Sequence, residues 1–247
     1  ARRQRQMCIR DRNRLIVSTL LLFCLLPIMA QGEQAVVATD SSAVRHQVLL
    51  QTSKGDMVVE LYNDTPKHRD NFLKLVRDGY YNGNLWHRVI ANFMIQTGDS
   101  TTRHAQPGER VGDRGLNYTI PAEIVFPKYF HKRGALAAAR EGDKANPERR
   151  SSAAQFYIVY GSPFSEAGLD RIQQRLDERT DSMVKLTPAI REVYRLRGGT
   201  PHLDGQYTVF GEVVQGLNVL EEIQAVPVDK NNRPLDDVRI TKAIVLK

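Results

Sequence analysis

Cysteine is almost absent from this chain. Its 247 residues include 2 cysteines, Cys8 and Cys24, and both lie within the first 30 positions. We interpret residues 1–30 as a removable segment, so the mature chain would contain no thiol. That excludes structural disulfides, thiolate catalysis and cysteine-ligated metals, and it suits an oxidising compartment.

A strong charge of one sign is missing from most of the chain. The net charge is +7 at pH 7, but six arginines and one aspartate place +5 of it within residues 1–30, which leaves +2 for the rest. Residues 31–247 are nearly neutral and therefore lack the basic surface that binds nucleic acids and anionic membranes. We therefore expect no nucleic-acid partner.

Long hydrophobic runs are limited to residues 15–30, which have arginines before them and polar residues after them. This run is short for a bilayer span and is interrupted by Pro27. The order of segments predicts a signal peptide at residues 1–30, cleaved after Ala30. We therefore expect export across the inner membrane, a periplasmic location and no stable membrane insertion after cleavage.

Two other fates of the N-terminus remain open. The hydrophobic run could remain as an uncleaved anchor, or Cys24 could carry a lipid, although the bulky Phe23 stands where lipoprotein signals have a small residue. Residues 1–12 are unlike a natural signal start and are left without an interpretation.

Strand-like alternation begins after an irregular leader at residues 31–45. Lys54-Gly55 lies between two alternating runs and indicates a hairpin, and Thr65-Pro66 opens a helix that Gly79 ends. Most later elements are short strands separated by glycine-containing turns, which predicts a closed β-barrel with helical caps. The expected strands are residues 46–53, 56–62, 85–90, 93–96, 135–139, 155–159, 207–213 and 238–246, and the second helix is 217–223.

Residues 165–199 break this rhythm. They are rich in Arg, Glu, Asp and Leu, and their apolar residues recur at near-helical spacing until Gly198-Gly199. We interpret the segment as a helical hairpin inserted between two barrel strands. It is either a solvated packing appendage or a lid or partner-docking arm.

The stretch 85–99, LWHRVIANFMIQTGD, resembles the signature of the cyclophilin family of peptidyl-prolyl cis-trans isomerases. In that signature a His-Arg-Val-Ile strand is followed by a Phe-Met-x-Gln strand and a Gly-Asp turn. Three further segments resemble family motifs in the family order: HKRGALAAA at 131–139, SAAQFYI at 152–158 and LDGQYTVFGEV at 203–213.

The resemblance implies an eight-stranded antiparallel barrel capped by two helices. Residues 46–247 are therefore expected to form a cyclophilin-like domain, with the helical insertion at about 165–199. The resemblance also implies an enzyme without a cofactor or a metal. Its partners would be proline-containing polypeptides and folding secreted proteins, whose X-Pro bonds it would rotate.

The chemistry of this rotation explains why the site needs a cationic side chain. Isomerisation of an X-Pro bond moves no proton and breaks no bond, and the barrier arises because twisting the C–N bond destroys amide resonance. The twisted amide has a pyramidal nitrogen with a free lone pair, so a fixed cationic donor beside it stabilises only that state. Arg88 is our candidate donor because a guanidinium is rigid and always charged.

The resemblance supplies the other candidates. Gln96 joins Arg88 as a catalytic residue, and Gln96 and the backbone around Ala139-Arg140 would hold the substrate carbonyls. Gln155 would order these groups by hydrogen bonds. The proline ring needs a dry apolar pocket. The expected substrate-binding residues are Phe93, Met94, Ala139, Arg140, Gln155, Tyr157, Leu203 and Tyr207.

Three of the departures from the family pattern concern aromatic positions of the pocket. His202 stands where many members have tryptophan, which argues against tight cyclosporin binding. Tyr207 replaces a common histidine but still offers an aromatic wall and a hydroxyl. Tyr157 replaces a common phenylalanine and adds a hydroxyl at the pocket floor, which needs a partner or water.

Other chemistries find less support in the sequence. The histidines are scattered without the close spacing of a metal site, and no serine stands in a glycine-framed nucleophile turn. We interpret His87 as a strand histidine whose hydrogen bonds are satisfied. The main rival function is a non-enzymatic peptide-binding chaperone or scaffold that uses the same groove, with the insertion as its docking arm.

Overall fold

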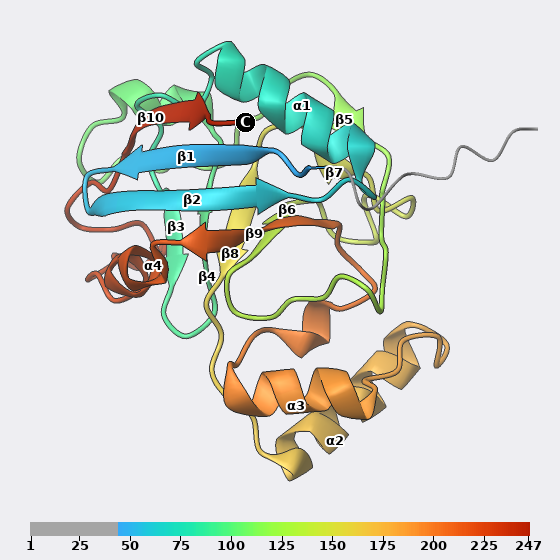
Figure 1. The fold of residues 1–247 in the computed structure, drawn as a ribbon. Helices are drawn as coiled ribbons and strands as arrows, with labels where there is room; N and C mark the ends of the chain where they lie inside the picture. The colour runs from blue at the N-terminus through green and yellow to red at the C-terminus, as the bar shows by residue number, and fades with distance from the viewer. Residues whose placement is uncertain (1–43) are drawn as a thin grey trace, which may run out of the picture. The chain divides into compact units, whose positions relative to one another are not determined.

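The computed structural model describes residues 44–247 (Figure 1). The predicted signal peptide, both cysteines and nearly all of the irregular leader lie outside these residues. Within the described range, no helix combines the length and the apolar content that crossing a bilayer requires.

Eight strands form one antiparallel sheet in the order β10-β1-β2-β9-β6-β8-β4-β3. A second sheet of two very short strands, β5 (Thr119–Ile120) and β7 (Ser151–Ser152), was not predicted, because two residues leave no periodicity to detect. The strands of the large sheet are β1 (Gln47–Thr52), β2 (Gly55–Leu61), β3 (Arg88–Ile90), β4 (Met94–Thr97), β6 (Ala135–Ala138), β8 (Phe156–Val159), β9 (Val209–Gln215) and β10 (Ile240–Val245).

The prediction of a closed barrel is not confirmed, because the sheet is an open half-barrel with β10 and β3 at its two edges. β3 is three residues long, and the expected strand residues 85–87 lie outside it. An isolated bridge joins Leu85 to Arg239, and the Trp86 N–H donates to the Val238 carbonyl at 2.8 Å. These contacts bring the edges together without a continuous ladder.

Helix α1 (Pro66–Arg77) packs on the main hydrophobic core through Phe72, Leu73, Leu75 and Val76. Proline at its first turn begins the helix as predicted. Thr65 makes no side-chain cap. Instead the distant Glu123 carboxylate accepts the N–H groups of Lys67, at 3.1 Å, and His68, at 2.9 Å. The second cap, α4 (Leu217–Gln224), buries Val219, Leu220 and Ile223 in the same core.

The central strands are buried on both faces, because successive side chains of a strand point to opposite sides. Phe156 and Ile158 of β8 and Ile95 of β4 enter the main core. Tyr157 and Met94 belong to a second cluster on the opposite face. This outer face, rather than the barrel interior, carries the candidate site.

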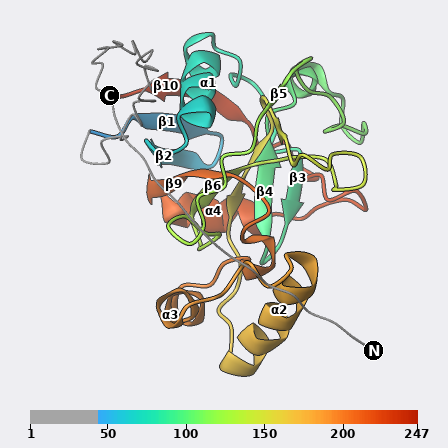
Figure 2. The same cartoon turned by 90° about the vertical axis from the view of Figure 1, so that its right-hand side faces the viewer.

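The predicted helical insertion is present as α2 (Glu166–Arg179) and α3 (Pro188–Leu196). Ser165 and Thr187 cap the two helices by accepting N–H groups of the first turn. The helices share their own apolar cluster, which includes Leu169 and Tyr194. Figures 1 and 2 show both helices on the side of the sheet away from α1, and the chain returns from α3 through the short 3-10 helix η2 (Pro201–Leu203).

Candidate functional site

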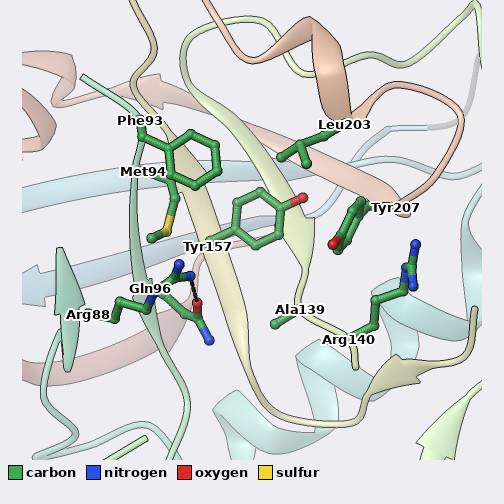
Figure 3. A pocket seen from close by; sticks show the side chains of 9 residues that line it. All are labelled: Arg88, Phe93, Met94, Gln96, Ala139, Arg140, Tyr157, Leu203 and Tyr207. Carbon is green, nitrogen blue, oxygen red and sulfur yellow. Dashed lines mark hydrogen bonds between the residues drawn. The ribbon is translucent and has the colours of Figure 1, made fainter. Parts of the chain in front are cut away.

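A pocket of about 250 Å³ opens on the outer face of β4, β6 and β8 (Figure 3). It brings together every predicted site residue except Gln155, whose side-chain oxygen accepts a hydrogen bond from Gln96. The lining residues are Arg88, Phe93, Met94, Gln96, Ala139, Arg140, Tyr157, Leu203 and Tyr207.

Arg88 is placed by the hairpin of β3 and β4. In this antiparallel pair Arg88 is the direct partner of Gln96, so the two side chains leave the same face of the sheet. The Arg88 Nη1 donates a hydrogen bond of 3.0 Å to the Gln96 Oε1 (Figure 3). The guanidinium is therefore held at one edge of the pocket.

A polar relay continues from Arg88 through Gln96 to Gln155. Arginine only donates, so the Gln96 amide oxygen must face it and the Gln96 amide nitrogen must face away. That nitrogen donates to the Gln155 Oε1 at 2.9 Å. The Gln155 Nε2 in turn donates to the carbonyls of Gly112, at 3.0 Å, and Arg114, at 2.8 Å. The orientation of each amide follows from the arginine at the end of the relay.

The Arg88 guanidinium is half-buried, and this burial lowers its pKa, whereas the nearby Tyr207 acts in the opposite direction. The side chain nevertheless stays charged at neutral pH, because arginine does not lose its proton in proteins. Among residues 44–247 no carboxylate forms an ion pair with it. Its remaining donors are therefore available to an electron-rich atom in the pocket.

Apolar side chains form the floor and one wall. Met94 and Tyr157 are almost fully buried, and Phe93 and Leu203 stand at the rim. The His202 ring stacks on Phe93 at 5.5 Å between centroids. Burial is the main cause that lowers the pKa of His202 to about 4; neighbouring positive groups act in the same direction, and Asp204 acts against them. At neutral pH His202 is therefore an uncharged ring that extends the apolar wall.

Arg140 contributes more than the backbone contact that the sequence predicted. Its guanidinium lies over the Tyr207 ring, 4.3 Å from the centroid, and its Nε donates to the Gln206 carbonyl at 2.9 Å. The Ala139 N–H donates to the Gln155 carbonyl, and the Ala139 carbonyl accepts from Ser152. Both backbone groups of Ala139 are thus occupied, so the proposed backbone contact with substrate falls on Arg140.

The Tyr157 hydroxyl has a partner that the sequence analysis missed. It lies 3.0 Å from the His131 Nε2, and His131 is itself bound to the buried Asp204. Both residues stand inside the quoted motifs 131–139 and 203–213. A usable signal existed, because a buried tyrosine hydroxyl requires a partner and polar residues of adjacent motifs are the first candidates.

The interpretation of His87 is wrong in two respects. His87 is buried as expected, but neither ring nitrogen has a hydrogen-bond partner within residues 44–247, and the residue precedes β3 rather than lying in it. Burial lowers its pKa to about 4, against the opposing effect of Asp99. His87 is therefore neutral at pH 7.

Metal ligation has no cluster to support it in the described part of the chain, where no three His, Cys, Asp or Glu side chains gather suitably. The pocket instead combines an apolar floor, one unpaired cation and an ordered amide. Such a site can hold a small apolar ring and stabilise an electron pair that develops beside it.

The chain resembles known proteins in sequence. The family model described as cyclophilin type peptidyl-prolyl cis-trans isomerase/CLD matches residues 47–245. A Staphylococcus saprophyticus protein named as a peptidyl-prolyl cis-trans isomerase is 35% identical over 196 residues, which span 78% of this chain and 88% of the relative. A protein of the same name from Staphylococcus aureus strain COL gives the same identity and coverage.

The fold has solved counterparts. A crystal structure of a Cryptosporidium parvum cyclophilin type peptidyl-prolyl cis-trans isomerase matches with a TM-score of 0.57 and 25% identity, over 83% of this chain and 99% of that one. A structure of the same enzyme in the presence of the dipeptide Ala-Pro matches with a TM-score of 0.56 and 25% identity, over 81% and 99% of the two chains. Family model, relatives and fold agree, and this chain belongs to the cyclophilin-type peptidyl-prolyl cis-trans isomerase family.

Proposed function

We propose that this protein accelerates cis-trans rotation of X-Pro bonds in polypeptides and needs no cofactor to do so. The observation that carries the proposal is the Arg88 guanidinium, hydrogen-bonded to Gln96 and free of an ion pair with residues 44–247, at the edge of an apolar pocket. Membership of the isomerase family supports the same activity.

The pocket favours the twisted amide in two ways. Phe93, Met94 and Tyr157 enclose the proline ring and leave the acyl side of the bond free to rotate. As the bond twists, the nitrogen lone pair is released toward Arg88, which gains a charge-assisted contact absent from both planar forms. Each increment of about 1.4 kcal/mol in this preference is worth a factor of ten in rate.

The substrates we propose are proline-containing polypeptides, including secreted proteins during folding. The Cryptosporidium structure determined in the presence of Ala-Pro supports a proline dipeptide as the minimal ligand. The near-neutral charge of residues 31–247 argues against a nucleic-acid partner. His202 in place of a tryptophan leaves a smaller wall beside Phe93, so we expect weak binding of cyclosporin.

We also propose a periplasmic location, with residues 1–30 acting as a cleaved signal peptide. The support is the sequence order of arginines, a short apolar run and a polar segment after Ala30. Detection of a mature chain beginning at Gln31 in a periplasmic extract would support it, and a full-length chain in the membrane fraction would contradict it.

The activity is tested by exchange NMR on a short Ala-Pro peptide with the mature wild type, Arg88→Ala and Arg88→Lys. We expect Arg88→Ala to lower kcat/KM by about a hundredfold, because one electrostatic donor is worth that much in comparable sites. Arg88→Lys should recover part of the rate, since it keeps the charge and loses the rigid geometry. Arg77→Ala, which removes an exposed arginine of α1, is the matched control and should match the wild type.

The rival function predicts a different result. A peptide-binding chaperone or scaffold would bind the peptide without accelerating its isomerisation, and Arg88→Ala would then change binding alone. Peptide affinity, measured by chemical-shift titration in the same samples, separates the two outcomes.

A further inference from the structure

A buried polar network of four hydrogen-bonded side chains runs from the pocket floor to the helical insertion. The Tyr157 hydroxyl lies 3.0 Å from the His131 Nε2, and the His131 Nδ1 lies 2.9 Å from the Asp204 Oδ1. The other carboxylate oxygen, Oδ2, accepts the Tyr194 hydroxyl at 2.7 Å. Tyr194 belongs to α3, so the polar network joins the insertion to the outer face of β8.

All four side chains are shielded from water. The exposed fractions are 0% for Tyr194 and Asp204, 1% for His131 and 5% for Tyr157. Hydrogen bonds in such surroundings are stronger than in water, and a group that loses its partner there is left unsatisfied. Each link therefore constrains the next one.

The direction of each bond follows from the chemistry of the groups. The Asp204 Oδ1 also accepts the His131 backbone N–H at 2.9 Å, and a carboxylate only accepts. The His131 Nδ1 must then carry the proton, so in the neutral ring the Nε2 accepts from the Tyr157 hydroxyl. The hydroxyl proton of Tyr157 is thus committed to His131 and points away from the substrate.

The polar network also contacts two residues of the pocket wall, Leu203 and Tyr207. Asp204 directly follows Leu203, which lines the pocket. The Tyr207 ring packs edge-on against both Tyr157, at 6.1 Å, and His131, at 6.3 Å. A shift of the His131–Asp204 pair would therefore move the floor and the wall together.

The insertion approaches this pair very closely. A side chain at Gly199 would have its Cβ 2.3 Å from the His131 carbonyl and 2.5 Å from the Tyr194 ring. The Thr200 N–H donates to that same carbonyl at 2.8 Å. Glycine is required at 199 because the chain leaving α3 passes directly over His131.

We propose that Tyr194 is a positioning residue for the proline pocket, acting through Asp204 and His131 on Tyr157. The helical insertion is then part of the site's construction rather than a separate appendage. The inference rests on the proposed isomerase function for its kinetic consequence. Packing alone would need only the two rings, whereas here both hydroxyls bind the same histidine–aspartate pair.

The test is a double-mutant cycle of Tyr194→Phe and Tyr157→Phe, measured by exchange NMR on the Ala-Pro peptide. Each variant keeps the ring and removes one hydroxyl. We expect Tyr194→Phe to raise KM by about fivefold and to leave kcat nearly unchanged, because a displaced wall weakens planar and twisted states alike. In the Tyr157→Phe background the same change should alter KM by less than about twofold, because the link to the pocket is already broken.

Two kinetic outcomes would overturn the proposal. Equal effects of Tyr194→Phe in both backgrounds would show that it acts independently of Tyr157. A lower kcat with unchanged KM would indicate only a smaller fraction of folded enzyme. Tyr160→Phe is the matched control, because its hydroxyl reaches Glu221 on α4 at 3.3 Å instead of the pocket, and its kinetics should equal those of the wild type.

A spectroscopic readout keeps this inference separate from the activity. Long-range proton–nitrogen NMR spectra should show the wild-type His131 ring protonated at Nδ1, and Tyr194→Phe should shift its nitrogen signals. His68, which pairs with Glu123 at 2.6 Å elsewhere, provides an internal reference that should not move. An inactive wild type would refute the proposed function. A His131 ring protonated at Nε2 would instead refute the polar network, because the hydrogen bonds would then run in other directions.

Discussion

The two sides of the pocket are built in opposite ways. On the Arg88 side, three partly buried side chains form a relay that ends on the backbone carbonyls of a loop. On the Tyr157 side, the four buried side chains of the polar network end on a helix of the insertion. The first arrangement leaves a donor for the substrate, and the second commits all its groups to one another.

Two of the three buried histidines among residues 44–247, His131 and His87, show the same contrast. His131 has a partner on each ring nitrogen, whereas His87, next to Arg88, has none within residues 44–247. A fully bonded histidine fixes the orientation of its neighbours. An unbonded one must remain neutral and fills space, so burial alone does not indicate a structural hydrogen bond.

The largest difference between the two sides should appear in stability. Asp204→Ala leaves the His131 ring, the His131 backbone N–H and the Tyr194 hydroxyl without an acceptor. We expect the free energy of unfolding to fall by about 3–5 kcal/mol, because each buried donor that loses its acceptor costs about 1–3 kcal/mol. Urea denaturation monitored by Trp86 fluorescence measures it.

The matched change on the Arg88 side is Gln96→Ala, which should lower the free energy of unfolding by less than about 1 kcal/mol, because water can replace a half-exposed amide. Asp204→Asn keeps one acceptor oxygen and should fall between the two. Equal losses for Asp204→Ala and Gln96→Ala would remove the contrast between the sides.

The second prediction concerns pH. The pKa of His87 is lowered from 6.5 to about 4, so between these values the unfolded chain binds a proton that the folded protein excludes. The stability from keeping His87 neutral is complete above pH 6.5 and is lost as the pH falls toward 4. At about 1.4 kcal/mol per pKa unit, the full loss is on the order of 3 kcal/mol.

Urea denaturation at pH 7 and pH 4.5 checks this expectation, with His87→Leu as the comparison. The variant has nothing to protonate at this position and should lose less stability on acidification than the wild type. The same loss in both proteins would show that other groups dominate the acid sensitivity.

The smallest expected effect is the loss of kcat/KM when the relay from Arg88 to Gln155 is interrupted. Gln155→Leu keeps the volume but removes the acceptor that holds the Gln96 amide. Gln96 would then turn more freely and Arg88 would be less well oriented, which we expect to lower kcat/KM by about tenfold. Gln173→Leu is the control, because Gln173 makes comparable hydrogen bonds inside the insertion, to Asp177 and Val184. A similar loss in both variants would argue against an oriented relay.

Much of the fold and pocket could be predicted because the relevant information is local. Alternation identified the strands of the large sheet, and the turn between 90 and 94 makes Arg88 and Gln96 cross-strand partners. The roles assigned to these residues remain predictions. The composition of residues 85–90 predicts one strand, but residues 85 and 86 meet residues 239 and 238 by isolated contacts ahead of β3.

The features that escaped prediction join residues far apart in the sequence. Glu123 caps α1 from 55 positions away, and His131 meets Asp204 across 73 positions. Neither pairing leaves a periodic trace, because a single polar side chain has no pattern to repeat. The demand of the Tyr157 hydroxyl for a partner was visible, whereas the partner's identity was not.

The sequence by itself determined the order of the strands of the large sheet and of helices α1 to α4, the family, and the pocket position of every predicted site residue except Gln155, because these depend on apolar patterning and on motifs of adjacent residues. Only the tertiary structure decided that the half-barrel stays open between β3 and β10, that His87 lacks a partner among the described residues and that Tyr194 of the insertion reaches Asp204. These outcomes depend on how distant segments pack, and a buried polar group takes whichever partner that packing brings within reach.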